Sequence, residues 1–261
     1  MSSKLLFVTT VAGLQYLEYA LIYIYSIKRA YPEYDVMIYS WDDITPIRKG
    51  LKLLNAEKCV KKIGFPYERS VKNYAKSRFL LGKHYFKNNK FAYIGDVDFF
   101  ICKETPTILE LHKSRLIQTG YCYSNEVREN MKRLTGLHFI DVDRYFNYTD
   151  SERIKAKKAI QEGDNSKTDE MMLYDMCEKS KAGLIPGNVR PHHGIHLGHV
   201  RQLLCKKNKR RKKGKNNIAQ IRQSYRMQFI DAYENDPLFQ KLITGLSIEK
   251  DIKLLYENLC N

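Results

Sequence analysis

Two carboxylates interrupt a hydrophobic segment in the first half of the chain. In residues 91–106, FAYIGDVDFFICKETP, Asp96 and Asp98 stand between apolar runs of the kind found in buried β-strands. Carboxylates at positions i and i+2 of such a segment are costly unless a cation or several hydrogen-bond donors compensate them. The pattern therefore indicates a metal or ligand site where a strand ends.

The first hundred residues alternate between apolar β-type runs and amphipathic helical patterns. Strands are predicted over residues 4–11, 34–41, 58–63 and 90–100, and helices over residues 13–30, 44–55 and 70–88. This alternation favours an α/β fold with a parallel sheet, with helices on both of its faces and with ligands at the carboxyl ends of its strands. We therefore expect Asp96 and Asp98 to lie at that edge of the sheet.

Beyond residue 115 the pattern is mixed. Strands are predicted over residues 115–123 and 136–142, helices over residues 145–161 and 168–180, and further helices, broken near Pro237, from Ile218 to the C-terminus. No Gly-x-Gly-x-x-Gly follows the first strand and no Gly-Lys-Ser/Thr occurs, which excludes a dinucleotide fingerprint and a P-loop. If a nucleotide binds, a metal must handle its phosphates.

The chain is strongly basic, with 45 Lys and Arg against 29 Asp and Glu and a formal charge of +16. The run from Lys206 to Lys215, KKNKRRKKGK, is almost wholly basic. Such a run is typical of a solvated loop, but it also attracts phosphates, anionic lipid headgroups or nucleic acid. It indicates the sign of a partner's charge and leaves the partner's identity open.

A second Asp-Val-Asp triplet, at Asp141 and Asp143, competes with the first. It leads into a predicted helix, where Asp143 can simply favour the helix N-terminus. The first triplet instead follows a predicted helix that carries Lys72, Lys76 and Arg78, cations suited to a phosphate-bearing ligand. We therefore expect the ligand site at the first triplet.

Histidines are concentrated late in the chain, in the segment PHHGIHLGHVR of residues 191–201. Four of the seven histidines fall there: His192, His193, His196 and His199. Imidazole nitrogens beside carboxylate oxygens make a mixed site that suits Mn²⁺. The alternative is a polar loop with capping histidines, and not all four can bind one ion.

The order of these pieces resembles the glycosyltransferases of the GT-A fold. The matching segments are YAKSR, YIGDVDFF, TDE and HLGHVR, and the resemblance covers most of residues 4–201. It is greatest to the glycogenin and bacterial lipooligosaccharide galactosyltransferase type, or to related capsule-type enzymes. It implies a single GT-A domain of the α/β class, with a Rossmann-like mixed sheet, flanking helices and a helical C-terminal part.

The resemblance also implies an organisation of the chain and a donor site. Residues 1–205 would form the nucleotide-sugar-binding and catalytic domain, residues 206–217 a basic loop, and residues 218–261 a helical extension of the same domain. Thr9, Thr10 and Ala12 would border the base and ribose of the donor. Arg78, and less directly Lys76, would reach the donor from the helix before the Asp-x-Asp.

The metal ligands follow from the same resemblance. Asp96 would contact the ribose and the metal, Asp98 the metal, and His196 would be the third ligand, in a loop with Gly198 and Arg201. Arg replaces the family's usual Lys in this loop and the Pro-Trp that often follows is absent, so the register stays open. The alternative ligands are His193 and His199.

Three further residues are candidates for catalysis. His138, in TGLHFI, falls where the family lines the donor sugar, although the usual Asn-x-Gly is absent, and we assign it to the sugar or acceptor side. Asp169 and Glu170 open a helix, where the helix dipole explains acidic residues by itself; the resemblance brings them near the reacting sugar and acceptor. If transfer inverts the sugar, one of them would be the general base; if it retains, the departing phosphate can take the proton.

The expected protein is thus a metal-dependent glycosyltransferase of the hexosyltransferase type, using Mn²⁺ or Mg²⁺ and a nucleotide-diphosphate sugar, with UDP-sugars implied by the resemblance. The acceptor would be a glycan, a lipid-linked sugar or a protein glycan. Alternatives are a metal-dependent phosphohydrolase and a basic protein that binds nucleic acid or a membrane surface.

We expect a cytoplasmic protein that contacts an anionic membrane peripherally through the run from Lys206 to Lys215. Nucleic acid is disfavoured because aromatic residues do not interleave this run. Six scattered cysteines without a Cys-x-x-Cys pair favour a reducing compartment.

Overall fold

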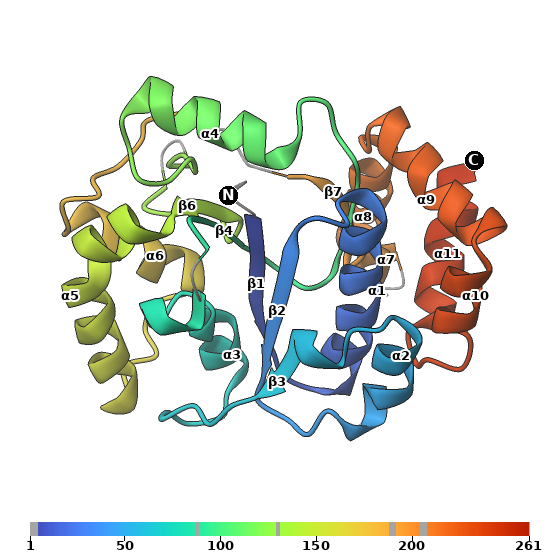
Figure 1. Ribbon diagram of the computed structural model, residues 1–261, viewed down its shortest axis with the longest axis horizontal. Coiled ribbons are helices and arrows are strands. Elements are labelled where there is room, and N and C mark those ends of the chain that lie inside the picture. The colour runs from blue at the N-terminus through green and yellow to red at the C-terminus, as the bar shows by residue number, and fades with distance from the viewer. Residues whose placement is uncertain (1–4, 87–88, 129–130, 188–191, 204–207, 261) are drawn as a thin grey trace.

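A five-stranded sheet forms the centre of the protein in the computed structural model, which describes residues 5–86, 89–128, 131–187, 192–203 and 208–260 (Figure 1). The strands, in spatial order, are β3 (Val60–Lys62), β2 (Asp35–Ser40), β1 (Leu5–Val11), β4 (Phe91–Ile94) and β6 (His138–Asp141). β3, β2, β1 and β4 pair in parallel, and β6 pairs antiparallel to β4. The predicted α/β class with a mixed sheet is confirmed.

The central strand β1 is buried on both faces, which explains its uninterrupted apolar sequence. Alternate side chains of a strand point to opposite faces, so Leu5 and Phe7 enter one hydrophobic core and Leu6 and Val8 enter another. The first core is closed by α1 (Leu14–Ala30) and the C-terminal helices, and the second by α3 (Val71–Ser77), α5 (Val142–Gln161) and α6 (Asp169–Glu178), on opposite sides of the sheet (Figure 1).

The remaining helices largely follow the predicted pattern. They are η1 (Thr45–Ile47), α2 (Arg48–Leu53), η2 (Glu57–Cys59), α3 (Val71–Ser77), η3 (Lys83–Phe86), α4 (Ile108–Thr119), α5 (Val142–Gln161), α6 (Asp169–Glu178), α7 (His199–Leu203), α8 (Asn208–Ala219), α9 (Gln223–Asn235), α10 (Pro237–Ile243) and α11 (Glu249–Cys260). None of the described helices has both the length and the apolar composition that a membrane-spanning helix needs.

The helix predicted over residues 70–88 is shorter than expected. Ser70 caps the start of α3 by accepting a hydrogen bond from the backbone N–H of Asn73. The helix ends at Ser77, because the turn that follows directs Phe79, Leu80 and Leu81 into the second core. Burial of these side chains outweighs continuation of the helical pattern.

The strand predicted over residues 115–123 is wrong, because most of this segment belongs to α4. Thr107 and Glu110 form a reciprocal capping box at its start, and Gly120 ends it in a left-handed conformation. Both end signals are readable in the sequence. They identify a helix where the apolar run alone suggested a strand.

The basic loop predicted over residues 206–217 is also wrong, because α8 runs through most of it. Gly214 lies against α7: a Cβ at this position would be 2.9 Å from the Cβ of Gln202. Ile218 is buried in the first core on the same helix. These contacts with α7 and the first core stabilise a helix in this strongly basic segment.

The C-terminal helices pack on α1 and break where the sequence predicts. Asp236 caps α10 by accepting from the backbone N–H of Leu238, and Pro237 occupies the first helical position. Phe239 packs its ring against Tyr25 of α1 at 4.8 Å. The C-terminal part therefore shares the first core with the sheet.

A second, two-stranded sheet was not predicted. It pairs β5 (Phe99–Ile101) antiparallel with β7 (Gly194–His196), and Phe99 lies opposite His196. Gly194 has a φ of 153°, and a Cβ there would lie 2.0 Å from the carbonyl oxygen of Phe100. Only glycine permits this approach, which brings the histidine-rich segment beside the Asp-x-Asp.

We predict that Gly194→Ala lowers the free energy of unfolding by at least about 2 kcal/mol, because the methyl group clashes with backbone that cannot move aside. Urea unfolding measures this. Gly64→Ala is the control, since a Cβ there meets nothing within 4 Å. Equal stability of the two variants would contradict the proposed constraint at Gly194.

Candidate functional site

A cavity of about 390 Å³ lies at the carboxyl ends of β1 and β4. Its walls come from the end of β1, the first turn of α1, one face of α3 and the segment after β4. The predicted site residues among these walls are Thr9, Thr10, Ala12, Arg78, Asp96 and Asp98. The structure thus brings these residues to one cavity at the carboxyl edge of the sheet, and their role in binding stays a prediction.

The two threonines hold the walls of the cavity together. The hydroxyl of Thr9 donates to the carbonyl oxygen of Gly95 at 2.7 Å, which ties β1 to the segment before Asp96. The hydroxyl of Thr10 lies 2.6 Å from that of Ser77 on α3. Both hydroxyls are thus engaged within the protein.

The buried guanidinium of Arg78 joins two predicted carboxylates. Its Nη1 lies 3.0 Å from Asp96 Oδ1 and its Nη2 lies 2.7 Å from Asp169 Oδ2. Burial acts to lower the pKa of Arg78, but the surrounding carboxylates outweigh it and raise that pKa above its usual value. Burial raises the pKa of Asp96, and the positive charge of Arg78 opposes that shift.

Gly136 makes this arrangement possible, and the sequence analysis did not identify it. A Cβ at position 136 would lie 2.5 Å from Arg78 Nη2 and 3.7 Å from Asp169 Oδ2. Any larger residue would therefore displace the guanidinium from Asp169. Gly136 lies in TGLHFI, two residues before His138.

Asp98 and His196 face each other across the junction of β5 and β7. His196 Nε2 lies 3.6 Å from Asp98 Oδ1, beyond hydrogen-bond distance. The backbone N–H of Leu197 donates to the carbonyl oxygen of Asp98 at 2.8 Å, which holds the two segments together. An oxygen and a nitrogen donor are thus held side by side.

The neighbouring histidines differ in their availability. Both ring nitrogens of His193 are engaged: Nδ1 lies 2.6 Å from Glu104 Oε2, and Nε2 lies 2.6 Å from His112 Nε2. His199 stacks on His196 with ring centroids 4.8 Å apart, and burial lowers the pKa of His199 to about 4, so its ring is neutral at pH 7. Of the three candidates, His196 is the one directed at Asp98.

Asp98 and His196 suit a metal ion whose remaining ligands come from a bound substrate. Among the side chains that the structure describes, no group of three or more His, Cys, Asp or Glu is arranged to hold a metal ion by itself. Asp98 and His196 supply two donors, while Asp96 is paired with Arg78. Mg²⁺ is commonly held by one or two carboxylates plus substrate phosphates, and a nitrogen donor extends the choice to Mn²⁺.

Lys76 does not line this cavity, which corrects its assignment to the donor. Its Nζ lies 3.3 Å from Asn165 Oδ1, and Lys72 reaches the backbone of the same asparagine. Val71 and Tyr74 of α3, and Arg78 directly after it, line the cavity, whereas Lys76 lines a different one on the other side of the helix. Helical periodicity alone would have predicted that Lys76 and Arg78 point to different sides.

His138 is a core residue and does not face a ligand, so its predicted role on the sugar or acceptor side is wrong. It is 0% exposed, and its ring lies 4.9 Å from Tyr123 and 5.2 Å from Tyr145. His138 and Ile140 alternate with Phe139 along β6, which directs the histidine into the second core.

The remaining predicted residues lie as follows. Glu170 pairs with Arg128 at 2.5 Å, so Asp169 is the member of this acidic pair that contacts Arg78. Gly198 is buried in the turn between β7 and α7. The side chain of Arg201 lies outside the described part of the structure.

The second Asp-Val-Asp triplet has a structural role. Asp141 caps α5 by accepting from the backbone N–H of Arg144, and Asp143 pairs with Lys83 at 2.7 Å. The interpretation of this triplet as a helix start is confirmed.

Two tyrosines at the cavity were missed by the sequence analysis. Tyr16 lies in the first turn of α1, and Tyr74 lies one helical turn before Arg78 on α3. The ring of Tyr74 packs edge-on against Trp41 at 5.0 Å. Helical spacing from Arg78 would have identified Tyr74, and the position directly after β1 would have identified Tyr16.

We predict that the buried neutral His138 makes the protein less stable in acid. Burial lowers the pKa of His138 from its ordinary 6.5 to about 3, so its contribution is fully present above pH 6.5 and is lost as the pH falls towards 3. Between pH 7.5 and pH 5 the loss from this residue is about 2 kcal/mol, because the unfolded chain takes up a proton that the folded one excludes.

His138→Phe fills the same space without titrating. In urea unfolding measured at a series of pH values, this variant should take up about one proton fewer on unfolding below pH 6.5. Retention of a cooperative transition at pH 8 is the control for folding. An unchanged slope of stability against pH in the variant would show that His138 does not carry the effect.

Comparison with known proteins gives a similarity of fold. No protein family model matches the chain, and no curated protein matches it. Among solved structures, it is similar to a crystal structure of an active-site mutant of LgtC, with 12% identity, 70% of this chain and 72% of that chain covered, and a TM-score of 0.46. A complex of the galactosyltransferase LgtC with donor and acceptor sugar analogues gives the same identity and coverage, with a TM-score of 0.45. At these values the likeness assigns no activity to this chain, and function has to be argued from the site.

Proposed function

We propose that this protein is a metal-dependent glycosyltransferase that moves a sugar, with a UDP-sugar as the donor class, onto a carbohydrate-bearing acceptor. The observation that carries the proposal is the meeting of Asp96, Asp98 and Arg78 at one cavity on the carboxyl edge of the parallel strands, with His196 3.6 Å from Asp98. That edge is where α/β sheets bind their ligands.

The cavity suits a nucleotide in size and lining. Its volume of about 390 Å³ lies within the usual range for small-ligand sites, roughly 300–1,000 Å³. Tyr16 and Tyr74 line the cavity and offer aromatic surface to a base or ribose. A diphosphate would then lie near Asp96 and Asp98.

The metal-binding residues and Arg78 would have different roles in the reaction. When bound at Asp98 and His196, with Asp96 as the third candidate, a divalent ion would neutralise the charge that develops on the leaving diphosphate. Arg78 keeps a permanent positive charge beside the same segment, in an orientation that its carboxylate partners fix.

Asp169, held by Arg78 at the start of α6, is the candidate for orienting the acceptor hydroxyl. It would be the general base if transfer inverts the sugar, and a positioning group if transfer retains it.

We predict Mn²⁺-dependent nucleotide binding that requires Asp98. In calorimetry with UDP, GDP and CMP, UDP should bind tightly with Mn²⁺ present, and Asp98→Asn should weaken it by about tenfold or more, because the amide removes a charged ligand. Mn²⁺ alone should bind weakly, since the phosphates complete its shell.

The matched control is Asp143→Asn, which makes the same change at the same position of the second Asp-Val-Asp triplet, where the carboxylate pairs with Lys83. Loss of UDP binding in both variants, or binding that ignores Mn²⁺, would count against the proposal. Incubation with UDP-sugars then separates the alternatives: a transferase releases UDP and glycosylates an acceptor, whereas a phosphohydrolase cleaves the diphosphate with water to give UMP and a sugar phosphate.

We further propose that α8 contacts anionic membrane surfaces. In the described part of the basic run, Lys212, Lys213 and Lys215 are exposed. Exposed lysines near an anionic bilayer contribute about 1 kcal/mol each to binding. A lipid-linked or surface-glycan acceptor would make such contact useful.

Co-sedimentation should detect binding to phosphatidylcholine vesicles with phosphatidylserine, but not to pure phosphatidylcholine, and salt should weaken it. Replacing Lys212, Lys213 and Lys215 by Glu should abolish it. The same charge change at the exposed Lys49, Lys52 and Lys58 is the control. Equal loss of vesicle binding in both triple variants would show that binding depends only on the net charge of the protein.

A further inference from the structure

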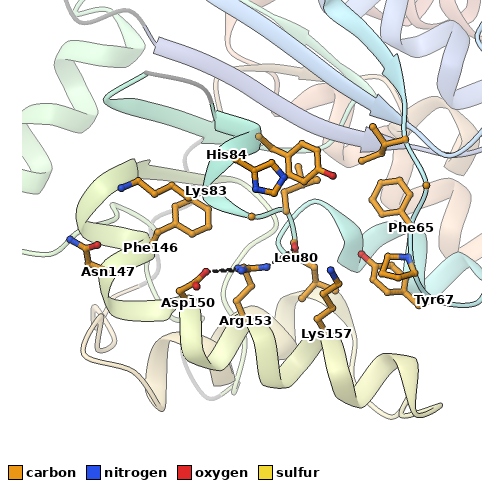
Figure 2. A pocket seen from close by; sticks show the side chains of 16 residues that line it. Phe65, Tyr67, Leu80, Lys83, His84, Phe146, Asn147, Asp150, Arg153 and Lys157 are labelled. Atoms are coloured by element: carbon orange, nitrogen blue, oxygen red, sulfur yellow. Dashed lines mark hydrogen bonds and ion pairs between the residues drawn. The ribbon is translucent and has the colours of Figure 1, made fainter.

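A second and larger cavity lies away from the candidate donor site. It measures about 920 Å³ and shares no lining residue with the donor cavity. Three segments form it: the loop of residues 63–67 after β3, residues 80–85 before β4, and the exposed side of α5 (Figure 2). Neither the proposed reaction nor the sequence motifs account for it.

Aromatic side chains are part of its lining: Phe65 is half-buried, and Tyr67 and Phe146 are buried. Phe65 and Tyr67 lie on one side of the hollow and Phe146 on the other (Figure 2). Phe65 stacks on Trp41 at 4.1 Å with an interplanar angle of 14°, so its ring is held in one orientation. Fixed aromatic faces of this kind pack well against the apolar face of a sugar ring, at little cost in conformational entropy.

The polar part of the cavity is mainly cationic. Lys83, Arg153 and Lys157 line it, against the single carboxylate of Asp150. Arg153 is buried at its base, where Nε and Nη2 contact Asp150 Oδ1 at 2.9 and 2.7 Å and Nη1 donates to the carbonyl oxygen of Leu80 at 3.1 Å. The guanidinium is therefore fixed by its neighbours.

Lys157 differs from the other two cations. Lys83 is paired with Asp143 at 2.7 Å and Arg153 with Asp150. Within the described residues, no ion pair is recorded for Lys157, which is half-buried at the rim, one turn beyond Arg153 on α5. Its ammonium group is the charge left to meet an anion.

We propose that this cavity binds an anionic carbohydrate, a sugar unit that carries a carboxylate or a phosphate. The aromatic walls take the ring, Lys157 takes the anionic group, and Asp150 and Asn147 meet the hydroxyls. The carboxylate of Asp150 disfavours a polyphosphate. Exposure of Lys83, His84 and Asn147 leaves room for the sugar to continue into a longer chain.

Saturation-transfer NMR and calorimetry test this with five probes: glucuronic acid, glucose 6-phosphate, glucose, inorganic phosphate and UMP. The two anionic sugars distinguish a carboxylate from a phosphate ligand, and at least one should bind at least about tenfold more tightly than glucose or inorganic phosphate. Lys157→Glu should abolish this binding and Lys157→Arg should retain it.

Lys158→Glu is the matched control, because this neighbour on α5 is exposed, does not line the cavity and pairs with Glu162. Phe65→Ala, checked for folding by its melting temperature, should weaken sugar binding and leave any phosphate binding unchanged. Asp98→Asn should change none of these results, so failure here is separate from failure of the donor site.

Three outcomes would overturn the proposal. Equal binding of the anionic sugars and inorganic phosphate would reduce the cavity to an unspecific anion site. Tighter binding of UMP, lost in Lys157→Glu, would make it a nucleotide site. Sugar binding that survives Lys157→Glu would place the ligand elsewhere.

Discussion

The ion pairs of Arg78 connect most of what defines the candidate site. A buried guanidinium is stable only where carboxylates and hydrogen bonds repay its desolvation, and here Asp96 and Asp169 do so from two different segments. Arg78 thereby fixes α3, the end of β4 and the start of α6 relative to one another. The arrangement needs Gly136, because a side chain there would occupy the space of the guanidinium. One residue thus serves both stability and the charge of the cavity.

The second constraint is the close approach of two distant strands. His196 reaches Asp98 because β7 pairs with β5, and this pairing depends on the absence of a side chain at Gly194. His193, three residues earlier, belongs to a different environment and closes a buried chain with His112 and Glu104. Neighbouring histidines in one motif therefore differ in role because a strand alternates its faces.

The features that the sequence could predict are those that depend on the pattern of neighbouring residues. β1 and α1 follow from their own apolar patterns, and the cavity at Asp96 follows from the general position of ligands in α/β sheets. The capping box at Thr107 and the helical face of Lys76 were local signals, so those two errors were avoidable.

Other features depend on contacts between distant segments. The burial of His138 depends on which face of β6 meets the second core, and Gly194 matters only because Phe100 lies opposite it. The larger cavity combines a loop, a turn and a helix that no motif links. No spacing in the sequence carries this information.

The two cavities differ in the charge that an anion would meet. Beside the candidate donor cavity, Asp96, Asp98 and Asp169 outnumber Arg78, so a diphosphate would approach a site with more carboxylates than arginines or lysines. A divalent ion is the direct way to reverse that balance, and this favours metal dependence independently of any motif. In the larger cavity, three cations already outnumber Asp150. The anionic sugar proposed for this cavity would therefore need no metal, in contrast to a diphosphate beside Asp96 and Asp98.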